Sequence, residues 1–294
     1  MRIRLIIPAL LFSFLLCGVF ADEISGERRT ERYSSGMKKS EGNIINGLKT
    51  GYWEYWHENG NISKEGEYLK GKRFGLWVER YEDNSVRSEA EYFDGSLNGI
   101  EKRWYPNGKL MSDAVYQKGK RDGVYRLNYQ NESVRAFVEY KDGKREGEFI
   151  TYFRDGGKEA EGRYFEDLKT GLWLKYHNNG IISIREIIKN DVREGKWENW
   201  YDNGSKRQEG FYSANQANGK WINWFDNGSV ESSGNYTRGV RSGEWKAWFR
   251  NRQLKELSNW KNGKKEGILK EWNSDGKLMK SEIYFKGKLV SKSE

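Results

Sequence analysis

Residues 195–218 read GKWENWYDNGSKRQEGFYSANQAN, and residues 219–242 read GKWINWFDNGSVESSGNYTRGVRS, which keeps the same kinds of residue at the same places. When the first glycine is numbered position 1, both segments have aromatic residues at positions 3, 6 and 7, Asn-Gly at positions 9 and 10, and Tyr at position 18. A glycine occurs at every 24th residue from Gly51 to Gly267. The chain is therefore built on a 24-residue repeat, with ten full units from residue 51 to residue 290.

Each unit is predicted to form a β-hairpin. Asn-Gly between two apolar-rich runs is typical of a two-residue type I′ turn, because both central residues need a positive φ. A second loop near positions 20–24, for example residues 70–73, then leads the chain into the next unit. We therefore expect an all-β fold, an elongated antiparallel β-meander built from about ten 24-residue β-hairpin repeats.

The predicted turn also predicts the register of the hairpin. A two-residue loop at positions 9 and 10 places position 7 opposite 12, position 3 opposite 16 and position 1 opposite 18, and opposite residues share a face of the sheet. Trp53 would then lie over Gly66 and Trp221 over Gly234, while the Tyr at position 18 would cover the glycine at position 1. We expect these rings to form the core.

The composition fits such an array. The chain has 294 residues, a mean hydropathy of −0.98 and 32% charged residues, yet 15% of it is aromatic, unlike a disordered chain. One 24-residue unit buries too little apolar surface to fold alone, so the units are expected to stabilise one another. A single Cys excludes a disulfide framework.

The first 21 residues are predicted to be a signal peptide. A basic start, Met1 to Arg4, precedes an apolar run from Leu5 to Ala21 that ends in Val-Phe-Ala, a pattern suited to cleavage before Asp22. The alternative is a lipoprotein signal with lipid anchoring at Cys17. We expect export to the periplasm, the outer envelope or the exterior. Residues 22–50 would form an N-terminal segment with a degenerate repeat, and residues 291–294 a C-terminal tail.

The repeat pattern resembles a known family. G-x-W-x-x-W/Y-Y/F-x-N-G followed by E-G-x-Y-x-x-G-x-R/K resembles the MORN repeat, best in residues 51–74, 195–218 and 219–242. It is most similar to the bacterial variant in proteins of the YwqK-type antitoxin family, and the likeness extends over residues 27–290. The resemblance implies stacked hairpins and a role in scaffolding, phospholipid binding or protein contacts. Units two, four and six depart from the pattern, at Arg80, Asn84, Glu132, Glu186 and Ile188.

Position 6 is the first candidate binding surface. Strict alternation turns it away from positions 3 and 7, with a mostly polar residue at position 13 opposite, so its rings would form an exposed platform for sugars, peptides or a partner sheet. The alternative is that a bulge between positions 3 and 7, or curvature of the sheet, buries these rings. The candidate platform consists of Trp56, Trp104, Tyr152, Tyr176, Trp200, Trp224, Trp248 and Trp272.

The two kinds of loop give a second candidate. Hairpin tips are often acidic, as at Glu58 and Asp202, whereas the return loops are rich in Lys and Arg. Since all loops of one kind lie along one edge of a meander, we expect a basic edge suited to anionic lipid or envelope polymer, or simply to solubility. The candidate basic edge consists of Lys70, Lys72, Arg73, Lys118, Lys120, Arg121, Lys144, Arg145, Arg238, Arg241, Lys264 and Lys265, and Lys286 and Lys288 continue it.

Nothing in the sequence indicates catalysis. His57 and His177 both occupy position 7, where other units have Tyr or Phe, so each is interpreted as a packing ring. A nucleophile with a His partner, a phosphate loop and a calcium-binding loop are all missing from the sequence. We expect no catalytic residue, no metal site, no cofactor and no small-molecule substrate, and therefore not an enzyme.

These observations together predict an exported, non-enzymatic scaffold in the cell envelope whose partner is another protein. Two alternatives stay open. The basic edge could bind membrane lipid or an anionic polymer, or the protein could neutralise a toxin as an antitoxin or immunity protein. Nucleic acid is not an expected partner, because export removes the protein from it.

Overall fold

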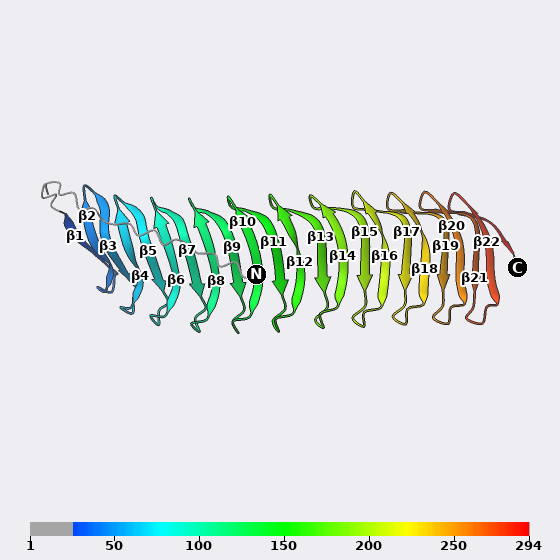
Figure 1. Ribbon diagram of the computed structural model, residues 1–294, viewed down its shortest axis with the longest axis horizontal. Coiled ribbons are helices and arrows are strands. Elements are labelled where there is room, and N and C mark those ends of the chain that lie inside the picture. Colours follow the sequence, from blue (N-terminus) through cyan, green and yellow to red (C-terminus); the bar gives the residue numbers. More distant parts are fainter. Residues whose placement is uncertain (1–25, 294) are drawn as a thin grey trace, which may run out of the picture.

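The computed structural model describes residues 26–293, and all regular structure in this range is β-strand. The strands form one 23-stranded sheet in which each strand pairs antiparallel with the next in sequence, so the sheet extends as a long ribbon (Figure 1). The predicted all-β meander of repeats is confirmed. Within residues 26–293 no second layer of strands or helices covers either face of the sheet.

The strands have the following bounds: β1 Glu27–Arg32, β2 Lys38–Ile45, β3 Leu48–Trp56, β4 Ile62–Leu69, β5 Lys72–Arg80, β6 Val86–Phe93, β7 Ser96–Trp104, β8 Leu110–Gln117, β9 Lys120–Asn128, β10 Val134–Lys141, β11 Lys144–Tyr152, β12 Lys158–Phe165, β13 Leu168–Tyr176, β14 Ile182–Lys189, β15 Val192–Trp200, β16 Lys206–Ser213, β17 Gln216–Trp224, β18 Val230–Thr237, β19 Val240–Trp248, β20 Leu254–Lys261, β21 Lys264–Trp272, β22 Leu278–Phe285 and β23 Lys288–Ser293. Residues 27–50, where the sequence repeat is degenerate, form the hairpin of β1 and β2 with the spacing of the other units.

The two turns of the unit differ from the prediction. At the tip after β3, Gly60 N–H donates to the carbonyl of His57 over 3.0 Å, and Gly60 has φ +88° while Asn59 does not have a positive φ. This is a three-residue loop, a type I turn followed by a left-handed glycine. The type I′ signature, two successive positive φ values, lies instead in the return turn, at Lys70 (50°) and Gly71 (81°). The predicted type I′ turn at positions 9 and 10 is therefore wrong.

The Asn or Asp at position 9 has another function. The side-chain oxygen of Asn59 accepts the backbone N–H of Asn61 at 3.0 Å, which holds the tip, and its amide nitrogen donates to the carbonyl of Glu82 in the next unit at 2.8 Å. Asn131, Asn179, Asn203 and Asn251 make the same bond to the following tip. The asparagine at position 9 thus joins neighbouring tips in five of the units.

The predicted register holds for half of the hairpin. Gly51 pairs with Tyr68 and Trp53 with Gly66, as expected for positions 1 and 18 and positions 3 and 16. The register then slips by one residue, and Trp56 pairs with Ile62. Every hairpin has this slip, a β-bulge that places position 6 opposite 12. The predicted pairing of position 7 with 12 is wrong.

The core ring at position 3 contacts the unit before it. Trp77 lies over Gly66 of the preceding unit, where an added Cβ would come within 2.5 Å of the indole. Trp53 in the same way covers Gly42, and Trp221 covers Gly210, so the expectation that each ring covers the glycine opposite in its own hairpin is wrong. Trp53 and Trp77 are each only 1% exposed. Stacking between units therefore forms the core.

The residue types at position 16 and at position 3 of the next unit vary together, as expected if these two positions are in contact. Wherever position 16 is glycine, as at residues 42, 66, 162, 210 and 234, the next unit has Trp at position 3. Where position 16 is Ala90, Ala114, Val138 or Ser258, the following position 3 is a smaller residue. Trp197, which follows Glu186, is the exception and is not fully buried.

The glycine at position 1 is required by the backbone. Gly51 and Gly75 have φ values of +68° and +65°, and an added Cβ would meet nothing within 4 Å at either. The pairing between units is irregular here, since Gly66 pairs with Trp77 but Glu67 with Phe74. The period-defining glycine thus permits a strand bulge, and the predicted cover by the Tyr at position 18 is wrong.

Candidate functional surfaces

The sheet has two faces of different character. We call the side of positions 3, 5, 7, 14, 16 and 18 the core face, because the buried tryptophans lie there, and the side of positions 2, 4, 6, 12, 15 and 17 the open face. Opposite residues in each hairpin share a face, and the bulge keeps positions 6 and 12 together with 4 and 15.

Rings on the core face form continuous rows. The ring of Tyr68 packs edge-on between Trp53 and Trp77, at centroid distances of 6.1 and 4.9 Å. The longest row alternates Trp and Tyr from Trp197 to Trp245 through three units. Such edge-to-face contacts contribute about 0.5–1.5 kcal/mol each beyond burial.

Basic residues at position 23 lie over these rings. Arg73 is 4.4 Å from the ring centre of Trp77, and Arg121 is 4.3 Å from that of Tyr125. Arg145, Arg241 and Lys265 cover rings in the same way. These five members of the predicted basic edge therefore contact the core face, and their charges are partly engaged by cation–π contacts.

Of the other residues of the basic edge, some form ion pairs and some do not. Lys72 pairs with Asp94 at 2.6 Å and Lys144 with Glu166 at 3.6 Å, each across to the next return turn. Within residues 26–293 no ion pair engages the side chains of Lys70, Lys118, Lys120, Arg238 and Lys264. The acidic turns at residues 166–167 and 190–191 and the neutral turn at 214–215 separate the basic turns of residues 70–145 from those of residues 238–288.

All eight candidate platform rings lie on the open face and are half-buried. Their cross-strand neighbour is position 12, which is aliphatic in most units, as in Trp224 opposite Val230 and Tyr176 opposite Ile182. The predicted polar neighbour at position 13 is wrong, because the bulge moves that residue. These rings are therefore flanked by apolar side chains, with one part of each ring accessible.

Phenol–carboxylate pairs are present on the open face. The Tyr52 hydroxyl donates to Glu65 at 2.7 Å, and Arg80, which replaces the ring at position 6, pairs with the same carboxylate at 2.8 Å. Burial and this hydrogen bond raise the pKa of Tyr52 to about 12. Burial alone would raise the pKa of Glu65, but the bonds from Arg80 and Tyr52 outweigh it and lower the pKa. Both groups keep their usual charges at neutral pH.

Exposed apolar pairs accompany the rings. Ile100 and Val115 face each other across a hairpin at positions 2 and 17, and they are 48% and 42% exposed. Leu172 with Ile187, and Ile268 with Ile283, repeat this arrangement in later units. The sequence reasoning missed these residues, although the predicted register already placed position 2 opposite position 17.

The two histidines have structural contacts. His57 Nε2 lies 3.1 Å from the carbonyl of Arg80, where the tyrosines at position 7 place a hydroxyl, as Tyr81 does on Trp104 at 2.8 Å. His177 repeats this contact at 2.9 Å. A carbonyl only accepts, so Nε2 carries the proton. This supports their interpretation as packing rings.

Residues 26–293 contain no group of three or more His, Cys, Asp or Glu placed to hold a metal ion. The helix-free range 26–293 likewise offers no membrane-spanning helix. The predicted signal peptide, residues 1–21, and the candidate lipid site Cys17 lie outside the described residues.

Comparison with known proteins finds a family match for four of the units. The family model described as the MORN repeat variant matches residues 49–70, 97–118, 193–214 and 217–237, each spanning the outgoing strand, the tip and the return strand of one unit. No protein of curated function matches the chain.

Solved structures give only distant likenesses. The crystal structure of TcdB2-TccC3-Cdc42 is similar at 11% identity over 88% of this chain and 17% of that chain, with a TM-score of 0.19. The Photorhabdus luminescens Tc holotoxin pore is similar at 11% identity over 87% of this chain and 15% of that one, with a TM-score of 0.18. This chain thus spans less than a fifth of the length of either of these two chains.

Proposed function

We propose that this array of MORN-variant hairpins is a non-enzymatic scaffold that binds another protein through its open face. The observation that carries the proposal is the row of half-buried rings at position 6, accompanied by exposed apolar pairs in units three, six and ten, on a face that no second layer covers within residues 26–293. Isolated exposed apolar residues are ordinary, but apolar side chains gathered along one face indicate an interaction surface.

The dimensions suit a protein partner. Each unit consists of two strands that are about 30 Å long and together about 10 Å wide. The projected area of one face of a unit is therefore about 300 Å². A stable interface needs about 800 Å² from each partner. Contact with about three neighbouring units is therefore enough, and the array offers several such places.

The place of action is also part of the proposal. Residues 1–21 support export, so we place the scaffold in the periplasm, the outer envelope or outside the cell. Its partner would then be an envelope or extracellular protein. An antitoxin or immunity role, which the likeness to the YwqK-type family suggests, would be a special case in which the bound protein is a toxin.

A second candidate function rests on the return turns. Lys118 and Lys120 extend from one edge without an ion pair inside residues 26–293, and Arg238 and Lys264 do so further along. These charges favour binding to anionic lipid or envelope polymer. Binding of this kind weakens steeply with added salt, whereas contact through the apolar open face does not.

The test separates the two surfaces. One variant carries Ile100→Glu, Leu172→Glu and Ile268→Glu on the open face, and its matched control carries Lys70→Glu, Lys118→Glu and Lys264→Glu on the edge. Both sets are exposed, so circular dichroism should show folded protein for each. Proteins cross-linked from envelope extract are identified and then tested pairwise with purified protein.

We expect a partner that the wild type and the edge variant bind but the open-face variant does not. Loss of that binding in the edge variant alone, or no partner sensitive to the open-face changes, would refute the proposal. Binding to anionic vesicles at low salt that the edge variant loses would support the second candidate.

A further inference from the structure

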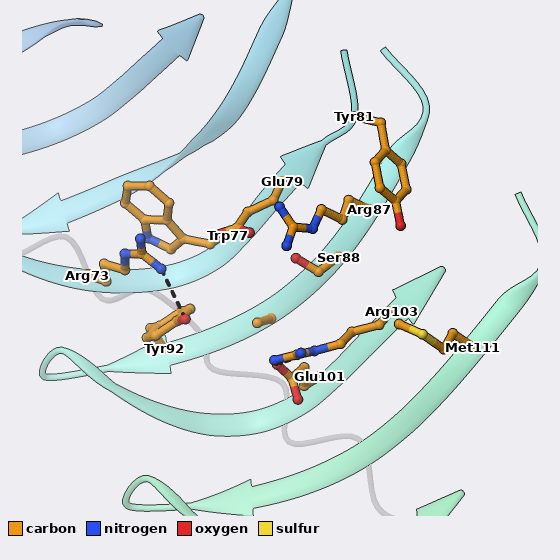
Figure 2. A pocket seen from close by; sticks show the side chains of 11 residues that line it. Arg73, Trp77, Glu79, Tyr81, Arg87, Ser88, Tyr92, Glu101, Arg103 and Met111 are labelled. Atoms are coloured by element: carbon orange, nitrogen blue, oxygen red, sulfur yellow. Dashed lines mark hydrogen bonds and ion pairs between the residues drawn. The ribbon is translucent and has the colours of Figure 1, made fainter. Parts of the chain in front are cut away.

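The row of core rings is broken between units two and three. Position 16 there is Ala90, and position 3 of the next unit is Glu101 in place of Trp. In regular units an indole fills this slot over the preceding strand, as Trp77 does over Gly66. Without it, a pocket of about 340 Å³ opens on the core face, lined by β5 to β8 (Figure 2).

One wall of the pocket is aromatic. Trp77 and Tyr92 form it, and Arg73 lies over both, 4.4 and 5.1 Å from their ring centres. The Arg73 guanidinium also donates to the Tyr92 hydroxyl at 3.0 Å, so its position is fixed (Figure 2). Trp77 is only 1% exposed and lies under Arg73, so this wall presents the Arg73 guanidinium and the half-buried Tyr92 ring to a ligand.

The opposite wall is charged. Arg103 donates twice to one oxygen of Glu101, at 3.0 and 2.7 Å, and the Glu101 residue is only 8% exposed. The Arg103 side chain is 54% exposed, so only the glutamate side of this ion pair is buried. Glu101 thus places a charged group where regular units have an indole.

Arg87 completes the pocket. It comes from β6 and points into the same space as Arg103 (Figure 2). Within residues 26–293 no hydrogen bond or ion pair engages its guanidinium, whose nearest aromatic ring is Tyr81 at 6.0 Å. Arg73, Arg87 and Arg103 outnumber the two lining carboxylates, Glu79 and Glu101, by a single positive charge.

We propose that this pocket binds a carboxylate monoanion, with the acid group at Arg87 and Arg103 and the rest of the ligand over Ala90 in the empty indole slot. A single excess charge suits one carboxylate better than a doubly charged phosphate. The carboxylate could belong to a free organic acid or to an Asp or Glu side chain of a partner protein. This site is separate from the open face.

The test measures binding of defined probes by titration calorimetry. Benzoate represents a free acid, N-acetyl-aspartate N-methylamide represents an acidic side chain, and benzamide is the neutral control. Arg87→Gln should weaken binding of the acids at least tenfold, or about 1.4 kcal/mol. Arg207→Gln changes the same position of a unit whose slot is filled by Trp221, and it should leave binding unchanged.

A second variant refills the slot. Ala90→Gly with Glu101→Trp restores the pair found in regular units, and a melting temperature no lower than that of the wild type would show that it folds. This double variant should abolish binding of the acids, because Trp fills the slot. Electrostatic attraction alone predicts the opposite, since removing the Glu101 carboxylate should strengthen the binding of an anion. The acid that binds identifies the source of the carboxylate. The proposal is refuted if neither acid binds the wild type, if benzamide binds as well as benzoate, or if the refilled variant binds normally.

Discussion

Replacing Gly66 by Ala tests the contact between successive units. An added Cβ would lie 2.5 Å from the Trp77 ring, whereas ordinary contacts begin at 3.4 Å, so the indole must move by nearly 1 Å. That ring is 1% exposed, donates to the Glu67 carbonyl at 3.0 Å and lies under Arg73 at 4.4 Å. The displacement therefore disturbs several contacts together.

The expected cost follows from these contacts. Overpacking a filled core costs about 1–3 kcal/mol. Ala gains about 0.5–1 kcal/mol over Gly in a strand, because less backbone entropy is lost on folding. The difference leaves a net loss in the free energy of unfolding of about 0–2.5 kcal/mol, and the displacement of a buried indole by nearly 1 Å places the expected value in the upper half of this range. Gly157→Ala is the matched control, since its Cβ would meet nothing closer than 3.4 Å and its φ is not positive, and its effect should be within about 0.5 kcal/mol.

The assay combines urea unfolding with amide hydrogen exchange, because a repeat array can unfold in parts. Protection should fall mainly in β4 and β5. Adding Trp77→Tyr should recover part of the loss, since Ala114 followed by Tyr125 already occurs in this chain, and the coupling should be about 0.5–2 kcal/mol. An equal cost for Gly66→Ala and Gly157→Ala, or strictly additive effects in the double variant, would refute the stacking of position 3 on the preceding unit.

Three further predictions concern single side chains. Folding lowers the pKa of Glu65 from 4.5, so the ionised Glu65 side chain stabilises the fold fully above about pH 4.5 and loses this effect as the pH falls through its folded-state pKa. The urea concentration at the midpoint of unfolding should therefore be constant from about pH 8 to 5 and decrease below about pH 4.5. The decrease should be smaller in Glu65→Gln. His57→Phe should cost about 0.5–1.5 kcal/mol by leaving the Arg80 carbonyl without its donor, whereas His57→Tyr should keep the stability in urea melts. Arg121→Met retains the apolar stem but removes the charge over Tyr125, and it should lower the unfolding free energy by about 0.5–2 kcal/mol.

Much of the fold could be predicted from the repeat. The glycine at position 1 recurs without a gap, and the aromatic residue at position 3 and Asn-Gly or Asp-Gly at positions 9 and 10 recur in most units, so the hairpin and its pairing of Trp53 with Gly66 follow from spacing alone. The turn type could not be obtained in this way, because Asn-Gly suits both a type I′ turn and a type I turn with a left-handed glycine. The bulge that separates Trp56 from position 13 leaves no distinct residue type in the sequence.

The larger error in the sequence-based prediction concerned which unit the core rings contact: they pack on the preceding unit, not on the glycine opposite in their own hairpin. Pairing within a hairpin and stacking between hairpins both bring Trp at position 3 close to a position-16 residue, and only the second matches Gly66 with Trp77 and Ala90 with Glu101. Comparing position 16 with the next unit would have revealed this. The missing indole at Glu101 was visible in the sequence, but the direction of Arg87 into the resulting pocket could not be predicted.

Small-angle X-ray scattering of the full chain in solution tests the central claim, that the repeats form one open ribbon with both faces free of a second layer. Strands spaced about 4.8 Å apart give a ribbon about 100 Å long, and hence a radius of gyration of about 30 Å. A compact domain of similar length would have about 19 Å. A value near 30 Å with a rod-like distance distribution is the predicted result, and a value of about 19 Å would contradict the account.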